Sequence, residues 1–390
     1  ALVGRRHVTH PRRVPDAVDE RPQVRARNAA PKREASHGQG VNEEAWVDHC
    51  GSASASGRRL PPTTVRASTP WGVHEREAGA TWQGKARPRE TLVAMTATIL
   101  LNPGPVTLSE RVRQSLLRPD MCHREADFAA LTASLKDRLR RIYPAPEHAA
   151  IVLTGSGTAA VEAMLATFAP VDDATLVVAN GVYGERMAAM LAAQRKPCLV
   201  LAAPWTDGID LAAVETALAD PRITHVAAVH HETTTGRLND AAALADLCTR
   251  RGRALLLDAV SSFGGEDVPV AACEAVAATA NKCLHGVPGV AFVMATTSAL
   301  ERSDERVPSV YFDLRRYHRE QQRGFSPFTM AVHACFALDA ALDELAEQGG
   351  WSARQARYAA LSHEIRASLL ACGLEPLVPH GGVQGAIGQR

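Results

Sequence analysis

The chain has 390 residues, of which 46% are hydrophobic and 22% are charged, and its formal net charge is +1. This composition is typical of an ordinary globular protein and leaves room for two domains. A charge so close to zero gives no reason to expect a nucleic acid or an anionic membrane as partner. No apolar run approaches the roughly 20 residues that a membrane-spanning helix needs.

The eight cysteines are scattered along the chain, with no CxxC pair and no His/Cys cluster at the spacing of a zinc site. We therefore expect reduced thiols in a cytosolic protein, and no metal site. Cys283 lies beside a lysine and could be read as a nucleophile. A small packing residue is the better interpretation of this cysteine.

Residues 1–94 differ in composition from the rest of the chain. They contain neither Phe nor Tyr, and they hold 16 Lys and Arg residues against 10 Asp and Glu residues. Such a segment buries too little apolar surface to offset the entropy of ordering it, so we expect disorder here. Our hypothesis is that the segment is a spurious upstream extension and that the functional protein begins near Met95. The alternative is a basic disordered tail that binds an acidic partner.

From Ile99 onward, short apolar runs alternate with amphipathic segments. Runs of Val, Leu and Ala without polar alternation indicate strands that are covered on both faces. The predicted strands are Ile151–Leu153, Leu176–Ala179, Leu199–Ala202, His225–Val229, Ala254–Leu257, Ala275–Ala278 and Val290–Met294.

The segments between these runs carry helical patterns. Helices are predicted within 109–142, over Gly157–Phe168, Val182–Gln194, Leu211–Ala219 and Ala241–Arg251, and near the end over Met330–Glu347 and Ser352–Cys372. Strands that alternate with crossover helices predict an α/β fold, with a mostly parallel sheet wrapped by helices. In such a fold the functional groups lie at the carboxyl ends of the strands.

An acid and a lysine follow two of the predicted strands. Asp258 ends the apolar run Ala254–Leu257, and Lys282 follows the run Ala275–Ala278. A pyridoxal phosphate site uses such an acid to keep the pyridine nitrogen protonated, and such a lysine to hold the cofactor as a Schiff base. The pair alone is weak evidence, because many buried strands end in carboxylates and most lysines are solvated.

The turn TGSGT, residues 154–158, separates a predicted strand from a predicted helix. Its glycines let backbone amides approach an anion, and the helix N-terminus adds a partial positive charge. Ser156 and Thr158 add hydroxyl donors. The turn is neither a Walker loop nor a GxGxxG fingerprint, so it reads either as a simple helix cap or as the phosphate site of the cofactor.

Two further turns carry polar or aromatic residues. NGVYG places Tyr183 where it could stack on a pyridine ring, although a half-buried structural tyrosine is equally consistent. HHETTTG brings His231, Glu232 and three threonines, whose hydroxyls could bind the cofactor's phenolic oxygen. The two adjacent histidines do not predict a joint metal site, because neighbouring residues of an extended chain point in opposite directions.

Together these segments resemble the 2-aminoethylphosphonate–pyruvate transaminases, which are fold-type I pyridoxal phosphate enzymes of the class V aminotransferase group. The resemblance rests on LLNPGPVTLSERV, DMCHREADF, LTGSGTAAVEAM, NGVYGERM, HHETTTGRLND, DAVSSFGG and ANKCLHGVPGVAFV, in the family's order over about 97–375. HETTTG, SSFGG and NKCxxGVPG are specific only in combination.

The resemblance implies a role for each matching position. Lys282 would be the Schiff-base lysine and Asp258 the partner of the pyridinium nitrogen. The remaining cofactor contacts would be Ser156, Gly157 and Thr158 at the phosphate, Tyr183 on the ring, Thr233 at the phenolic oxygen, Asn281 beside the lysine, and Thr329, which would reach the phosphate across a homodimer interface.

The implied reaction moves the amino group of 2-aminoethylphosphonate to pyruvate and gives phosphonoacetaldehyde and L-alanine, as a step of phosphonate catabolism in the cytoplasm. We expect a large cofactor-binding domain over 95–345 and the start of a truncated small domain over 346–390. The family's small domain carries an arginine that binds the substrate anion, and no counterpart follows here. The alternatives are an alanine–glyoxylate or serine–pyruvate aminotransferase, and a fragment with impaired catalysis.

Overall fold

The computed structural model describes residues 99–302 and 306–378. Our predictions for 1–94 and for the last twelve residues therefore lie outside the described part of the chain. The predicted division at residues 345 and 346 stays a prediction.

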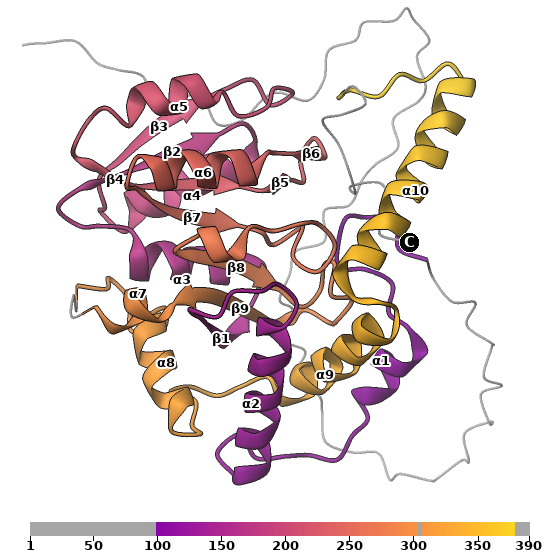
Figure 1. Cartoon of the computed structure of the whole chain (residues 1–390). Helices are drawn as coiled ribbons and strands as arrows, with labels where there is room; N and C mark the ends of the chain where they lie inside the picture. Colours follow the sequence, from indigo (N-terminus) through magenta and orange to yellow (C-terminus); the bar gives the residue numbers. More distant parts are fainter. Residues whose placement is uncertain (1–98, 303–305, 379–390) are drawn as a thin grey trace, which may run out of the picture. The chain divides into compact units, whose positions relative to one another are not determined.

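A seven-stranded sheet forms the centre of the described fold, in the order β1-β9-β8-β7-β4-β2-β3 (Figure 1). A separate pair, β5 and β6, forms a short antiparallel ribbon. The strands are β1 (His148–Gly155), β2 (Ala174–Ala179), β3 (Cys198–Ala202), β4 (Ile223–Val229), β5 (His231–Glu232), β6 (Arg237–Leu238), β7 (Ala254–Asp258), β8 (Ala275–Thr279) and β9 (Gly289–Thr296).

Each of the seven predicted apolar runs lies inside a strand of this sheet. The mostly parallel α/β fold is confirmed, because β9 is antiparallel to both of its neighbours and the other strands run in one direction. The carboxyl ends of the six parallel strands therefore meet at one edge of the sheet, which we call the carboxyl edge. The opposite edge is the amino edge.

The predicted helices also form, with ends that differ by a few residues. The helices are α1 (Glu110–Ser115), α2 (Ala126–Arg140), α3 (Gly157–Phe168), α4 (Val182–Ala193), α5 (Leu211–Ala217), α6 (Ala241–Arg250), α7 (Thr297–Glu301), α8 (Leu314–Gln322), α9 (Val332–Glu347) and α10 (Gly350–Ala371).

The hydrophobic pattern missed α7 and α8. Helix α8 has the sequence LRRYHREQQ, and its buried face includes Arg315, His318 and Gln321. Buried polar side chains need hydrogen-bond partners, and Gln321 finds them in the backbone N–H and C=O of Val152 on β1. This side chain thus covers the exposed edge of the sheet as a neighbouring strand would.

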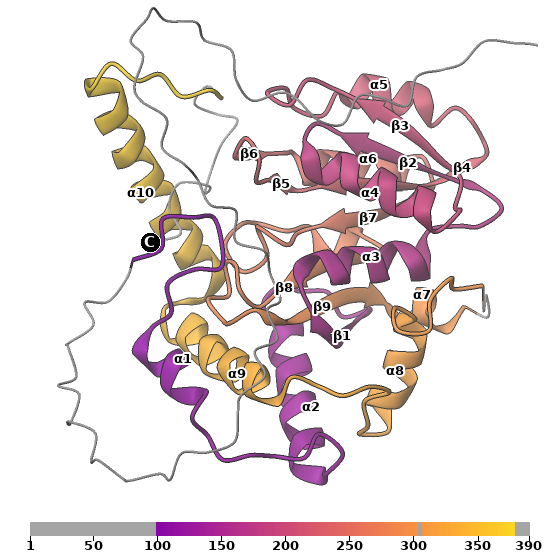
Figure 2. The same ribbon diagram turned by 180° about the vertical axis from the view of Figure 1, so that it is seen from behind.

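Two hydrophobic clusters lie on opposite faces of the sheet, and β1 contributes alternate residues to each. Ala150 and Val152 pack with α2, α6 and α9, whereas Ile151 and Leu153 pack with α3, α4 and α8. Figure 2 shows the face that α3 and α4 cover. Because both faces are buried, the strands read as continuous apolar runs.

Within the part of the chain that the structure describes, no helix combines the length and the apolar character needed to cross a membrane. Seven cysteines fall in this part, and all of them are free thiols. Cys283 is buried, and burial raises the pKa of its thiol to about 12. This environment agrees with the interpretation of Cys283 as a packing residue, since a nucleophilic cysteine needs its thiolate form.

Candidate active site

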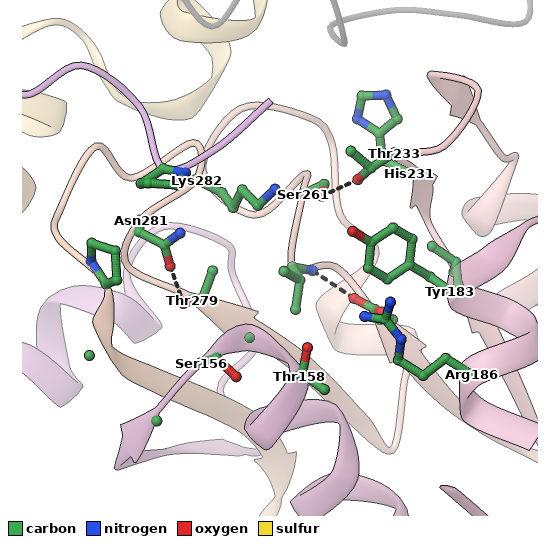
Figure 3. A pocket seen from close by; sticks show the side chains of 18 residues that line it. Ser156, Thr158, Tyr183, Arg186, His231, Thr233, Ser261, Thr279, Asn281 and Lys282 are labelled. Atoms are coloured by element: carbon green, nitrogen blue, oxygen red, sulfur yellow. Dashed lines mark hydrogen bonds between the residues drawn. The ribbon is translucent and has the colours of Figure 1, made fainter. Parts of the chain in front are cut away.

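A cavity of about 350 Å³ opens at the carboxyl edge of the sheet (Figure 3). The ends of β1, β4, β7 and β8 and the start of α3 and α4 contribute its wall. The volume lies in the range of small-molecule and cofactor sites. All but one of the predicted site residues line it, namely Ser156, Gly157, Thr158, Tyr183, Thr233, Asp258, Asn281 and Lys282.

Asp258 is the last residue of β7 and is 5% exposed. Its Oδ1 accepts a hydrogen bond of 2.9 Å from the backbone N–H of Val260, which orients the carboxyl group. Burial raises the pKa of Asp258 to about 6, because the protein removes water from the charged form, and the Val260 N–H and the positive charges of Lys282 and Arg186 compensate for this only in part. A cationic ligand group beside this carboxylate would supply the rest of that compensation.

Lys282 follows β8 by three residues, and its side chain lines the cavity (Figure 3). The Nζ atom donates to the carbonyl oxygen of Pro103 at 3.4 Å. Gly104 lies so close that a Cβ atom there would be 2.5 Å from Cδ of Lys282. Burial lowers the pKa of Lys282 and so favours the neutral amine, which is the form that acts as a nucleophile or a base.

The TGSGT turn forms the helix cap that was one of its two interpretations, and its role as a phosphate site stays a prediction. Ser156 is the N-cap of α3, and its side chain accepts from the N–H of Ala159 at 3.3 Å. The first backbone bond of the helix is donated by Ala160 to Ser156. The amides of Gly157 and Thr158 thus belong to the first turn, where a helix presents its unpaired N–H groups and partial positive charge to an anion. Both residues line the cavity.

Gly157 is a position where any side chain would force its neighbours to move. A Cβ atom there would lie 2.6 Å from Cγ1 of Val260, which itself lines the cavity. The glycine lets the helix start approach the segment that follows Asp258. The anion site and the carboxylate consequently face one space.

Tyr183 stands on the first turn of α4, and the guanidinium of Arg186 lies 4.6 Å from the centre of its ring. The buried carboxylate of Glu232 accepts from the N–H of Tyr183 at 3.1 Å and from the hydroxyl of Thr234 at 2.8 Å. This contact fixes the start of α4 against the HETTTG segment. The aromatic ring is held at the cavity wall by these contacts.

Two side-chain hydrogen bonds orient other predicted residues. The Oγ1 of Thr233 and the Oγ of Ser261 are 2.6 Å apart, and Thr279 donates to Oδ1 of Asn281 at 2.8 Å. Thr329 is exposed and does not line the cavity. Its carbonyl oxygen lies 3.3 Å from the hydroxyl of Thr154, one residue before the cavity-lining Gly155. Its predicted contact with a second subunit stays a prediction.

The sequence interpretation gave no role to several residues that line the cavity: Arg186, His231, Val260, Ser261 and Thr279. A signal existed for Arg186, which lies three positions after Tyr183 and therefore on the same face of a helix. His231 was considered only as a metal ligand, and a joint metal site with the adjacent histidine was not predicted. Burial lowers its pKa to about 4, so the ring is neutral near pH 7.

The groups around the cavity match one class of cofactor. The helix start offers donors to a phosphate, the Asp258 carboxylate fits a ring cation, and the Lys282 amine can form a bond with an aldehyde carbon. Tyr183 offers a flat surface for the ring. The residues present fit pyridoxal phosphate.

The comparison with protein families gives the class. Residues 109–378 match the family described as "Aminotransferase class-V". The chain belongs to the class V aminotransferases, whose cofactor is pyridoxal 5′-phosphate. It is an aminotransferase of this family.

Similar proteins carry more particular names. The chain is 40% identical over 291 residues to the 2-aminoethylphosphonate–pyruvate transaminase of Pseudomonas aeruginosa, covering 73% of this chain and 78% of that protein. It is 41% identical over 285 residues to the enzyme of that name in Burkholderia mallei, covering 72% and 77%.

Solved structures agree with the fold. The pyridoxamine–pyruvate aminotransferase of Mesorhizobium loti is 28% identical, with a TM-score of 0.68 over 74% of this chain and 75% of that chain. The alanine–glyoxylate aminotransferase of Nostoc sp. is 25% identical, with a TM-score of 0.69 over 77% and 81%.

Proposed function

We propose that this aminotransferase transfers the amino group of 2-aminoethylphosphonate to pyruvate. The observation that carries the proposal is the convergence of Lys282, Asp258 and the start of α3 on one cavity. The choice of substrate is supported by the relatives of that name at 40% and 41% identity.

Each residue has a part in the proposed reaction. When bound, pyridoxal phosphate supplies an electron sink that lowers the cost of removing a proton from the carbon next to the amine. Lys282, which burial keeps closer to its neutral form, takes up that proton and later returns it. Asp258 holds a negative charge at the ring cation, and this charge lowers the barrier by about 3 kcal/mol.

The remaining residues bind and orient the cofactor. Gly157 and Thr158 bind the phosphate through the first-turn amides of α3, and Ser156 adds its hydroxyl. Tyr183 stacks on the ring, Thr233 binds the phenolic oxygen, and Asn281 lies beside the lysine. These contacts set the ring against the amine, and correct placement is a large part of catalysis.

An absorbance titration tests the proposal. The purified chain should develop a visible band with pyridoxal phosphate, and the Lys282→Ala variant should not. Addition of 2-aminoethylphosphonate should then bleach the band, and pyruvate should restore it with formation of alanine. L-serine and L-alanine are the comparison substrates.

The outcomes separate the competing activities. A band that responds to serine or alanine with glyoxylate, but not to 2-aminoethylphosphonate, would assign the chain to the alanine–glyoxylate or serine–pyruvate type. A band that responds to none of these amines would contradict activity of this chain.

We also propose a homodimer in which Thr329 of each subunit reaches the phosphate of the other. The position of Thr329 beside the end of β1 supports this arrangement. Sedimentation of the cofactor-loaded chain measures its mass. A monomer that binds pyridoxal phosphate as tightly as its Thr329→Ala variant would contradict the proposal.

A further inference from the structure

We propose that Arg354 and Tyr358 of α10 are positioning residues for Lys282, acting through the loop that carries this lysine. The inference rests on the proposed role of Lys282 as the residue that bonds to the cofactor. Neither of the two α10 residues lines the cavity. They contact the loop that carries Lys282, residues 280–288, which we call the lysine loop.

The lysine loop has an unusual backbone conformation. Its internal bonds run from the N–H of His285 to the carbonyl of Lys282 at 2.9 Å, and from the N–H of Gly286 to the carbonyl of Ala280 at 2.8 Å. His285 has a φ of 64°, which is the left-handed region that side chains other than glycine rarely adopt. Such a conformation persists only where surrounding contacts hold it.

Helix α10 supplies contacts of this kind. The Nη1 atom of Arg354 donates to the carbonyl oxygen of Cys283 at 2.5 Å, directly after the lysine. The Oη atom of Tyr358 and Nε2 of His285 are 2.5 Å apart. Arg354, Tyr358 and His285 are all nearly fully buried, at 3%, 2% and 3% exposed. Hydrogen bonds in such surroundings are strong and costly to break.

The same helix also contacts the segment that follows Asp258. A Cβ atom on Gly265 would lie 2.9 Å from Cε2 of Tyr358 and 2.9 Å from Sγ of Cys283. Nε2 of Gln355 donates to Glu266 at 3.1 Å. One face of α10 therefore packs against the lysine loop and against the segment that follows Asp258, and it sets the position of one relative to the other.

Loss of these contacts should change the environment of the lysine amine. The titratable groups that face Lys282 are Asp258, Cys283 and His231, and the carbonyl of Pro103 accepts its hydrogen bond. A displaced lysine loop would admit water to the amine. Solvation favours the charged form, so the pKa of Lys282 would rise towards its ordinary value and less neutral amine would be available near pH 7.

The test measures capture of pyridoxal phosphate by the cofactor-free full-length chain, without any amino substrate. Stopped-flow absorbance gives the rate of covalent capture as a function of pH. Tyr358→Phe removes the hydroxyl that contacts His285 and the side chain of Cys283, and Arg354→Met removes the donor to the Cys283 carbonyl. The matched control is Arg357→Met, an exposed arginine on the same helix.

We expect both variants to capture the cofactor about threefold to tenfold more slowly at pH 7, because the nucleophile is the neutral amine. Their pH–rate profiles should move to higher pH, and at high pH the rates should approach that of the unmutated chain. Arg357→Met should match the unmutated chain throughout. The loss from Tyr358→Phe combined with His285→Asn should be smaller than the product of the two separate losses, because the two side chains share one contact.

Two results would overturn the inference. In one, Tyr358→Phe and Arg354→Met lower the thermal stability but leave the capture rate and its pH profile as in the control, which means that α10 only packs. In the other, the unmutated chain forms no lysine bond, which would remove the basis of the inference. A chain that captures the cofactor but does not act on 2-aminoethylphosphonate would contradict the proposed substrate. It would not contradict this inference, which the capture rates of the variants decide.

Discussion

The buried acids at the two edges of the sheet have pKa values that are shifted in opposite directions. At the amino edge, Glu274 contacts His225 at 3.4 Å and Arg302 at 2.7 Å. Burial opposes its charge, but these two partners outweigh burial, and the pKa of Glu274 is lowered. At the carboxyl edge, burial raises the pKa of Asp258 to about 6 and that of Glu266 to about 7.

The difference separates a buried acid that forms ion pairs within the protein from buried acids whose charge a ligand could balance. A buried acid in contact with cationic partners stays charged, whereas a buried acid without such a contact costs free energy until a ligand or a proton arrives. Perturbed acids of the second kind gather at functional sites. The carboxyl edge also contains the cavity and the start of α3.

The largest expected effect is a loss of turnover that occurs for a substitution at the carboxyl edge but not for one at the amino edge. Asp258→Asn should reduce turnover by about 100-fold to 1,000-fold, because an amide cannot balance a ring cation. Glu274→Gln, at the amino edge, should leave turnover per folded molecule within about twofold, because residues outside the site act only through stability. Steady-state kinetics on cofactor-saturated protein measures both, and equal losses would contradict the division between the edges.

The pH dependence of stability should have opposite signs for the two glutamates. The raised pKa of Glu266 means that the folded state prefers the protonated acid. Its stabilising contribution is therefore complete below the unfolded pKa of 4.5 and is lost as the pH rises through about 7. Glu274, with a lowered pKa, contributes above its unfolded pKa and loses that contribution as the pH falls.

Denaturant unfolding of the cofactor-free chain at several pH values checks these signs. Relative to the unmutated chain, Glu266→Gln should gain about 3 kcal/mol between pH 4.5 and pH 8, the value that the shift to about 7 implies. Glu274→Gln should instead show a nearly constant deficit over this interval and should lose that deficit below pH 4.5, because the lowered pKa of Glu274 places its titration there. A Glu266→Gln difference that is the same at both pH values would show that Glu266 titrates normally.

The smallest effect concerns the anion site. Gly157→Ala would place a Cβ atom 2.6 Å from Cγ1 of Val260, so the start of α3 or the Val260 segment must move. We expect the dissociation constant of pyridoxal phosphate to rise about tenfold, in keeping with the usual cost of overpacking. Gly208→Ala is the matched control, because its Cβ atom would meet nothing within 4 Å. Equal affinities of the two variants would argue against a phosphate at the start of α3.

The sequence by itself determined the strands and most of the cavity wall. The seven apolar runs and the turns that follow them are local patterns, and parallel strands bring the turns to one edge. Asp258, Lys282, Ser156 and Tyr183 could be placed in this way, and all four line the cavity.

Only the tertiary structure decided which distant side chains support these residues. The reversed direction of β9, the cover of β1 by Gln321, and the approach of Gly104 to Lys282 leave no periodic signal in the chain. Arg354 meets the Cys283 carbonyl across 71 positions, and Tyr358 meets His285 across 73. Such contacts form because the packing of helices and strands brings together two residues that are far apart in the sequence. A local pattern of hydrophobic and polar residues does not predict which distant residues will meet.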